Sequence, residues 1–231
     1  MSETPERAPL SKERVLRTAV ALADRRGADA LSMRLLAKEL GAGAMSLYHY
    51  VANKDEIIDG MVDLVFDEIA LPTTDGDWRA AMRQRALATR DALARHPWAI
   101  ALMESRTQPG PANLRHREST LAILRRAGFT VAAATHANWL LDSYLYGFAL
   151  QVATLPFDTK EQLADMTEQV FIPQIPADRF PYLHEAAAEL VAAGYDPATE
   201  FEVGLDLILV ALEALQSGRS APALTAGSRP A

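Results

Sequence analysis

Residues 31–58 restrict the fold of this chain more than any other segment, because three short helical patterns follow one another within them. Their sequence is LSMRLLAKELGAGAMSLYHYVANKDEII. Ser32 can cap a first helix by accepting from an amide of its opening turn, and Gly41 can adopt the left-handed conformation that ends it. A second short helix is predicted over 44–50, and Asn53 can cap a third, longer one. This layout predicts a helix-turn-helix, whose second helix enters the major groove of DNA.

The apolar positions of these helices support the same layout. Leu31 and Leu36 occupy the two positions of a hydrophobic staple around the first helix. Asn53 followed by Glu56 has the spacing of a capping box, in which each side chain accepts from a backbone amide of the other residue. Upstream, Ser11 can cap a further helix that also carries one apolar face. Helices with these faces can share one small core.

Polar and aromatic side chains that this core does not need gather at the end of the second short helix. They are Ser46, Tyr48, His49, Tyr50 and Lys54. Hydroxyl, imidazole and ammonium groups suit phosphate oxygens, and the rings can pack on sugars and thymine methyl groups. The alternative is that the tyrosines lie at the edge of the core and that Lys54 is a solvated charge. Within a helix-turn-helix pattern, contact with double-stranded DNA is the better interpretation.

The pattern LGxxxxxLYxxVxNK at Leu40–Lys54 resembles the DNA-binding domain of the tetracycline-repressor family of bacterial transcription regulators, over about residues 12–62. The resemblance implies a homodimer that binds a palindromic operator with its first domain and a small-molecule effector with its larger helical domain. By position, it also implies that Arg34 contacts DNA, that residues 44–50 are the recognition helix and that Lys54 contacts a phosphate. The complete predicted DNA-binding set is Ser32, Arg34, Gly43, Ala44, Met45, Ser46, Tyr48, His49, Tyr50 and Lys54.

The start of the recognition helix departs from the residues that usually identify bases. Ala44 and Met45 offer methyl groups and no bidentate donor, so no guanine or adenine can be assigned to an operator position. We expect specificity to depend on thymine methyl contacts, on Arg34 and on the shape of the DNA.

Charge and composition are consistent with a cytoplasmic protein that binds DNA through one end. The chain has 231 residues, no cysteine and a net charge of −7. Residues 1–55 hold 9 Lys and Arg against 7 Asp and Glu, a net of +2, whereas the remaining 176 residues carry −9. A mildly basic head on an acidic body makes affinity for DNA dependent on salt. No signal peptide or membrane-spanning apolar run is recognised, so no membrane partner is expected.

The expected fold class is all-α, with a three-helix helix-turn-helix domain followed by a larger helical ligand-binding and dimerisation domain. We expect a disordered arm at 1–10, a DNA-binding domain at 11–70 whose last helix links to the body, the body at 71–217, and a disordered tail at 218–231. Helical periodicity in the body covers 77–95, 98–106, 110–127, 130–154, 159–171, 179–193 and 197–217. Arg7 and Lys12 could let the arm touch DNA, but a solvated tail is the favoured interpretation.

A polar stripe marks the otherwise apolar segment His136–Gln151. Asn138, Asp142 and Tyr146 lie about one turn apart, and an unpaired buried polar group costs on the order of 1–3 kcal/mol. Either the stripe faces a ligand cavity, or it hydrogen-bonds to a neighbouring helix or across a subunit interface; both remain open. With residues from the region where the resembling family lines its cavity, the predicted effector set is Trp98, Met103, Arg106, His116, His136, Asn138, Trp139, Asp142 and Tyr146.

The last helix, near 198–217, is rich in leucine, which indicates a dimer interface. The predicted interface residues are Leu205, Ile208, Leu209, Leu212 and Leu215. The resemblance implies that this helix pairs with the one at 130–154 to form a four-helix bundle between two subunits.

No enzyme, metal or cofactor is predicted. The glycines before Ser46 lack the third glycine of a dinucleotide-binding motif, and His184 lacks the second histidine that a metalloprotease helix needs. Where the family's founding member has a metal-binding histidine, this chain has Leu102 or Met103, which disfavours a magnesium–tetracycline effector. The main hypothesis is a repressor released by a small, mostly apolar ligand. The alternatives are a repressor without an effector and, less well supported, a helical small-molecule-processing enzyme.

Overall fold

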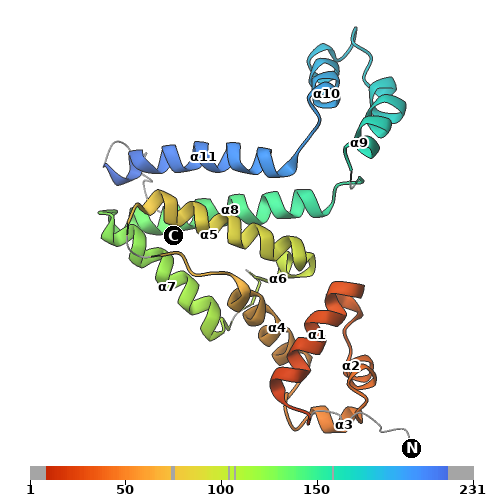
Figure 1. Ribbon diagram of the computed structural model, residues 1–231, viewed down its shortest axis with the longest axis vertical. Helices are drawn as coiled ribbons and strands as arrows, with labels where there is room; N and C mark the ends of the chain where they lie inside the picture. The colour runs from red at the N-terminus through yellow and green to blue at the C-terminus, as the bar shows by residue number, and fades with distance from the viewer. Residues whose placement is uncertain (1–8, 74–75, 104, 107, 158, 218–231) are drawn as a thin grey trace, which may run out of the picture.

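The computed structural model describes residues 9–73, 76–103, 105–106, 108–157 and 159–217, and all regular secondary structure within these ranges is helical (Figure 1). The predicted all-α fold class is therefore confirmed. The expected tail at 218–231 and the expected arm, apart from residues 9 and 10, lie outside the described residues. No helix of the described part is long and apolar enough to cross a membrane.

The N-terminal helices form a small unit with its own core, here called the head. It consists of α1 (Lys12–Arg26), η1 (Ala28–Ala30), α2 (Met33–Leu40), α3 (Ala44–Leu47) and α4 (Lys54–Glu68). The predicted caps are present: the hydroxyl oxygen of Ser11 accepts from the Arg14 amide and that of Ser32 from the Leu35 amide, both at 3.2 Å. Gly41 ends α2 in the left-handed conformation, with φ of 62°. Leu36, Leu47, Ile57 and Met61 are among the fully buried residues of the head core.

Two local details of the head differ from the prediction. The recognition helix α3 ends at Leu47 rather than at Tyr50: residues 48–50 form a turn in which the Tyr50 amide donates to the Leu47 carbonyl, three residues back, and Val51 is buried in the head core. The predicted capping box is shifted by one residue. Asn53 accepts from the Glu56 amide at 2.8 Å, but the Glu56 carboxylate accepts from the amide of Ala52 at 2.6 Å, not from that of Asn53.

Helix α4 belongs to the head and to the rest of the molecule at once. Ile57 and Met61 lie in the head core. Val62, Val65 and Phe66, on the following turns, lie in a second apolar cluster that includes residues of α5 (Trp78–Arg95) and α6 (Ile100–Met103). The head is thus attached by a packed helix and not by a flexible linker.

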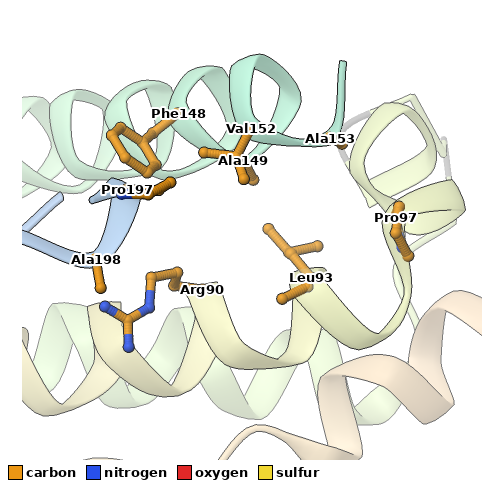
Figure 2. Close-up of a pocket in the computed structure, with 10 residues that line it drawn as sticks. Arg90, Leu93, Pro97, Phe148, Ala149, Val152, Ala153, Pro197 and Ala198 are labelled. Carbon is orange, nitrogen blue, oxygen red and sulfur yellow. The ribbon is translucent and has the colours of Figure 1, made fainter. Parts of the chain in front are cut away.

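The remaining helices form the body. In addition to α5 and α6 they are η2 (Pro97–Ala99), α7 (Pro111–Arg126), α8 (Val131–Ala153), α9 (Lys160–Met166), η3 (Thr167–Phe171), η4 (Ile172–Gln174), α10 (Pro181–Ala193) and α11 (Pro197–Gln216). Helix α11 lies along α8, whereas α9 and α10 project beyond the body (Figure 1). Where α5, the end of α8 and the first turn of α11 meet, the packing leaves a cavity (Figure 2).

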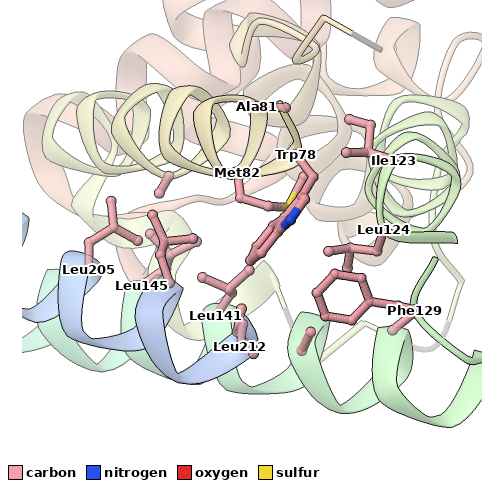
Figure 3. Close-up of a cluster of buried hydrophobic side chains, with 14 of the residues drawn as sticks. Trp78, Ala81, Met82, Ile123, Leu124, Phe129, Leu141, Leu145, Leu205 and Leu212 are labelled. Carbon is pink, nitrogen blue, oxygen red and sulfur yellow. The ribbon is translucent and has the colours of Figure 1, made fainter. Parts of the chain in front are cut away.

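The main body core lies between α5, α7, α8 and α11 (Figure 3). Trp78 and Phe129 meet edge to face in it, with ring centroids 5.0 Å apart. Leu141 of α8 and Leu205 of α11 are buried in the same cluster, with exposures of 1% and 0%. These contacts fix α11 against α8 within one protomer.

The residues predicted for the dimer interface mostly belong to this core, which corrects the prediction. Leu205, Leu209 and Leu212 are 0–4% exposed in the single chain, and Ile208 and Leu215 are partly buried against the same cluster. A contact with another subunit cannot use side chains that the protomer already covers. Helix α11 has a second apolar row that points outward, consisting of Val203, Leu207 and Val210, with exposures of 52%, 68% and 62%. Both rows of α11 are apolar, so the sequence pattern alone could not tell which row faces outward. The prediction chose the inner row.

Candidate functional site

All ten residues of the predicted DNA-binding set are exposed. Ser32 and Arg34 lie at the start of α2, and Lys54 lies at the start of α4. Residues 43–46 lie at the start of α3, and residues 48–50 form the turn that follows it. Leu47, which is fully buried, anchors α3 so that its other side chains face solvent. Met45 is 77% exposed, so its side chain is available for contact.

The chemistry of this surface suits a nucleic-acid backbone. Tyr48, His49 and Tyr50 present hydroxyl and ring-nitrogen groups, and Lys54 places an ammonium at the N-terminal end of α4, where free amides also favour an anion. The neighbouring carboxylate of Asp55 opposes phosphate, but it lies 3.5 Å from the guanidinium of Arg106 and is partly compensated. The set can therefore hold DNA phosphates around the methyl-rich start of α3.

The polar stripe of α8 is held by a buried ion pair. Arg85 of α5 donates from Nη2 to Oδ1 of Asp142 at 2.5 Å, and the two side chains are only 8% and 13% exposed. Asn138 donates to the other oxygen of Asp142 at 3.0 Å. The Oδ1 atom of Asn138 is buried and has no hydrogen-bond partner among the described residues. Asn138, Trp139, Asp142 and Tyr146 also line a pocket of about 260 Å³ together with Arg117 and Ser143. The stripe thus bonds to a neighbouring helix and also lines a pocket.

Further buried polar groups continue this layer across the body. His116 is 6% exposed, and its pKa lies below the ordinary 6.5 because of burial and the nearby Arg85 charge. On α7, Asn113, His116 and Thr120 fall between Ala112 of one apolar cluster and Ile123 of the other. Together with Arg85, Asn138 and Asp142, these residues are here called the polar layer.

The rest of the predicted effector set lies elsewhere. Met103 is buried in the apolar cluster next to α4. Trp98 donates from its indole nitrogen to Asp24 of α1 at 2.6 Å, and Arg106 is paired with Asp59 and Asp55 of α4. His136 is exposed on α8. Only Asn138, Trp139, Asp142 and Tyr146 line one pocket, with His116 in the same polar layer.

The junction of head and body contains a histidine that sequence reasoning missed. His96, at the end of α5, lies 2.7 Å from Asp24 of α1 through Nδ1 and 3.1 Å from Glu68 of α4 through Nε2. Although burial opposes it, hydrogen bonds from His96 and Arg95 lower the pKa of Glu68 below 4.5. One side chain thus connects the body to two helices of the head. No local spacing signals this contact, since the partners are distant in sequence.

A row of aspartates on α4 makes a second connection. Asp55, Asp59, Asp63 and Asp67 are spaced four residues apart and so share one side of the helix. The first two engage Arg106, Asp63 accepts from the amides of Ala112 and Asn113 at 2.9 and 3.0 Å, and Asp67 pairs with Arg115 at 2.7 Å. This row, here called the aspartate row, fastens Arg106 and the first turns of α7 to α4. The four-residue spacing of these aspartates can be read from the sequence, but the prediction did not use it.

An exposed helix-turn-helix joined by a packed helix to an all-helical body with a buried polar layer defines a DNA-binding regulator in two parts. Comparison with known proteins agrees. Residues 15–61 match the description of bacterial regulatory proteins of the tetR family, and residues 71–216 match the tetracyclin repressor-like C-terminal domain. The chain belongs to the TetR family. It is a transcriptional repressor of this family and not an enzyme. In the described part, no group of three or more His, Asp or Glu residues is placed to hold a metal ion.

Individual relatives match over nearly the whole chain. The HTH-type transcriptional repressor DrrR1 of Streptomyces coeruleorubidus is 34% identical, covering 94% of this chain and 85% of its own. The tetracycline repressor protein class C of Escherichia coli is 28% identical, covering 90% of this chain and 92% of its own. The TetR family protein ActR of Streptomyces coelicolor, solved in complex with actinorhodin, is 31% identical, covers 90% and 99% of the two chains and superposes with a TM-score of 0.71.

Proposed function

We propose that this repressor binds a palindromic operator as a homodimer in the cytoplasm and leaves it when a small, mostly apolar effector occupies the body. The observation that carries the proposal is the exposed set on α2, α3 and the start of α4, attached to the body by a helix that both cores share. In this proposal residues 11–70 are the DNA-binding domain and residues 71–217 the effector and dimerisation domain, with α4 as the link.

Selection from a random duplex pool would supply the operator, as an inverted repeat with half-sites about one helical turn apart. Lys54→Ala should then weaken operator binding and lower the slope of log K against log salt. Each lost phosphate contact removes about 0.9 from the slope, so two Lys54 side chains in a dimer remove roughly 1.8. Lys38→Ala, an exposed lysine of α2 outside the predicted set, is the matched control. Unchanged affinity in Lys54→Ala and Tyr50→Ala would refute this assignment of the DNA-binding surface.

The proposed dimer uses the outward faces of α8 and α11. Trp139 and Leu150 of α8 and Val203, Leu207 and Val210 of α11 are large apolar side chains that the protomer leaves 52–72% exposed. Such a surface on two adjacent helices is typical of an interface between subunits. Leu207→Glu should give monomers in sedimentation and lose operator affinity, whereas Leu114→Glu, on an exposed position of α7, should not. A Leu207→Glu protein that stays dimeric would place the interface elsewhere.

The proposed effector site is the polar layer with its pocket of about 260 Å³. The unpartnered Oδ1 of Asn138 and the solved complex of the relative ActR with actinorhodin support it. Effector binding would favour a body conformation that misplaces the two recognition helices, with a coupling of about 1–3 kcal/mol, or 5–150-fold in operator affinity. Operator binding measured with a panel of small molecules tests it, and Asn138→Leu should abolish the response.

The second candidate is a repressor without an effector. One observation favours it: Arg85 satisfies both the charge and a hydrogen bond of Asp142 without any ligand. If no compound of the panel changes either operator affinity or the melting temperature, this second candidate is the better account.

A further inference from the structure

The cavity at the meeting point of α5, the end of α8 and the start of α11 is separate from the proposed effector pocket (Figure 2). Its volume is about 360 Å³, within the range of about 300–1,000 Å³ that small-molecule sites occupy. Ten residues line it, and none of them lines the pocket around Asn138. Apart from Arg90 every lining side chain is a hydrocarbon, including Leu93, Phe148 and Val152. The cavity is therefore an apolar chamber with a single charged group.

Arg90 is held in place but is not fully used. Its Nε and Nη2 atoms both donate to Oδ1 of Asp91, at 3.0 and 2.9 Å, and its guanidinium carbon lies 5.2 Å from the centre of the Phe201 ring. The third nitrogen, Nη1, is buried and has no hydrogen-bond partner among the described residues. A buried donor without an acceptor costs about 1–3 kcal/mol, so an acceptor from outside the chain would remove a real penalty.

The arrangement in the cavity separates charge from hydrocarbon. Arg90 lies beside Ala198 at one end, and Pro97 lies at the other, with Leu93 and Val152 facing the space between them (Figure 2). No carboxylate lines the cavity. The carboxylates closest in sequence lie outside the lining: Asp91, 57% exposed, pairs with Nε and Nη2 of Arg90 and leaves Nη1 without an acceptor, and Asp196 caps α11 by accepting from the amides of Ala198 and Thr199. A guanidinium with a free edge prefers an anionic oxygen to a neutral one.

We propose that this cavity binds an apolar monocarboxylate, with a carboxylate oxygen accepting from Nη1 of Arg90 and the hydrocarbon part against Leu93, Phe148 and Val152. The site is additional to the effector site and does not rest on it, since the two share no lining residue. The same chemistry excludes a cation, because its charge would face Arg90. A neutral alcohol of equal length would gain the apolar contacts and at most a hydrogen bond without charge assistance.

Calorimetry on the full-length protein without DNA tests the proposal with three probes of one chain length, used below their micelle concentrations: decanoate, decanol and decylamine. Decanoate should bind most tightly, decanol more weakly and decylamine not measurably. Arg90→Met keeps the hydrocarbon stem and removes the donors. It should weaken decanoate by about tenfold or more, to about the affinity of decanol, and change decanol binding much less. Arg126→Met, an exposed arginine at the end of α7, is the control and should bind decanoate like the wild type.

A second variant tests the location independently of the charge. Ala94 lines the cavity from an exposed position of α5, so Ala94→Trp can fill the space without entering the core. It should abolish the binding of both decanoate and decanol, while the circular dichroism spectrum and operator binding stay unchanged. Decanoate binding at wild-type affinity in Arg90→Met, or measurable decanoate binding in Ala94→Trp, would overturn the proposal. A change of oligomeric state in Ala94→Trp would overturn it too, since a second copy would then occupy the cavity. Operator affinity is not the readout, so failure of the effector hypothesis would leave this result intact.

Discussion

Replacing Asp63 by alanine should destabilise the junction between α4 and α7 by about 2–3 kcal/mol. Gly110, the residue before α7, has no side chain to cap that helix, and Oδ1 of Asp63 accepts from the Ala112 and Asn113 amides instead. Loss of a capping side chain costs about 0.5–2 kcal/mol, and hydrogen bonds to a charged group contribute about 1.5–3 kcal/mol. Because Asp63 is half-buried, water replaces these bonds only in part.

The next aspartate of the same row is a matched control. Asp67 pairs with Arg115, but the two side chains are 62% and 54% exposed, and exposed ion pairs contribute about 0–1 kcal/mol. Asp67→Ala removes the same charge from the same side of α4 without removing a cap. The difference between the two variants therefore isolates the capping contribution.

Thermal unfolding at one fixed protein concentration measures both variants, since a dimer's midpoint depends on concentration. For a chain of this size 1 kcal/mol shifts the midpoint by about 2–4 °C, so Asp63→Ala should lose roughly 4–12 °C. Gly110→Ala should have a similar effect, because an added Cβ would lie less than 3.0 Å from atoms of Asp63. Equal shifts in Asp63→Ala and Asp67→Ala would refute the capping argument.

Three further outcomes are expected in urea unfolding. Arg85→Met should cost about 3–5 kcal/mol by leaving Asp142 buried without its partner, and adding Asp142→Leu should recover most of that loss. The pKa of Glu56 lies below 4.5, because its carboxylate accepts from the Ala52 amide and from Lys12. The contribution of Glu56 to the free energy of unfolding is complete above pH 4.5 and disappears as pH falls through its pKa in the folded protein. Glu56→Gln should therefore flatten the acid side of the curve of stability against pH. The pKa of His116 lies below 6.5, so stability should decline as pH falls below 6.5 toward the folded value, and His116→Gln should remove that decline.

The features of the head that the sequence predicted correctly depend on neighbours in the chain. Ser11 and Ser32 cap helices through amides three residues away, and Gly41 ends α2 through its own backbone conformation. Contacts of this kind follow from spacing alone. The end of α3 was predicted too late because burial of Val51, a tertiary effect, ended the helix early.

The features that were missed depend on residues far apart in the chain. Asp142 is 57 positions from Arg85, and His96 is 72 positions from Asp24, so no periodic pattern connects them. The polar stripe of α8 was visible, but only the packing of α5 against α8 decides which of its groups are paired. For α11, periodicity revealed apolar rows and could not decide which row the protomer covers.

Helix α4 also determines how far this protein can be treated as two exchangeable modules. A chimera that joins its head to a foreign body must break the chain near this helix. A junction before Lys54 would leave the head without Ile57 and Met61, whereas a junction after Glu68 would present Val62 and Phe66 to a surface that they did not evolve with. The aspartate row adds the same requirement for charge, because its partners lie in the body. Functional hybrids should therefore require that the buried side of the helix and its aspartates be redesigned together with the receiving body.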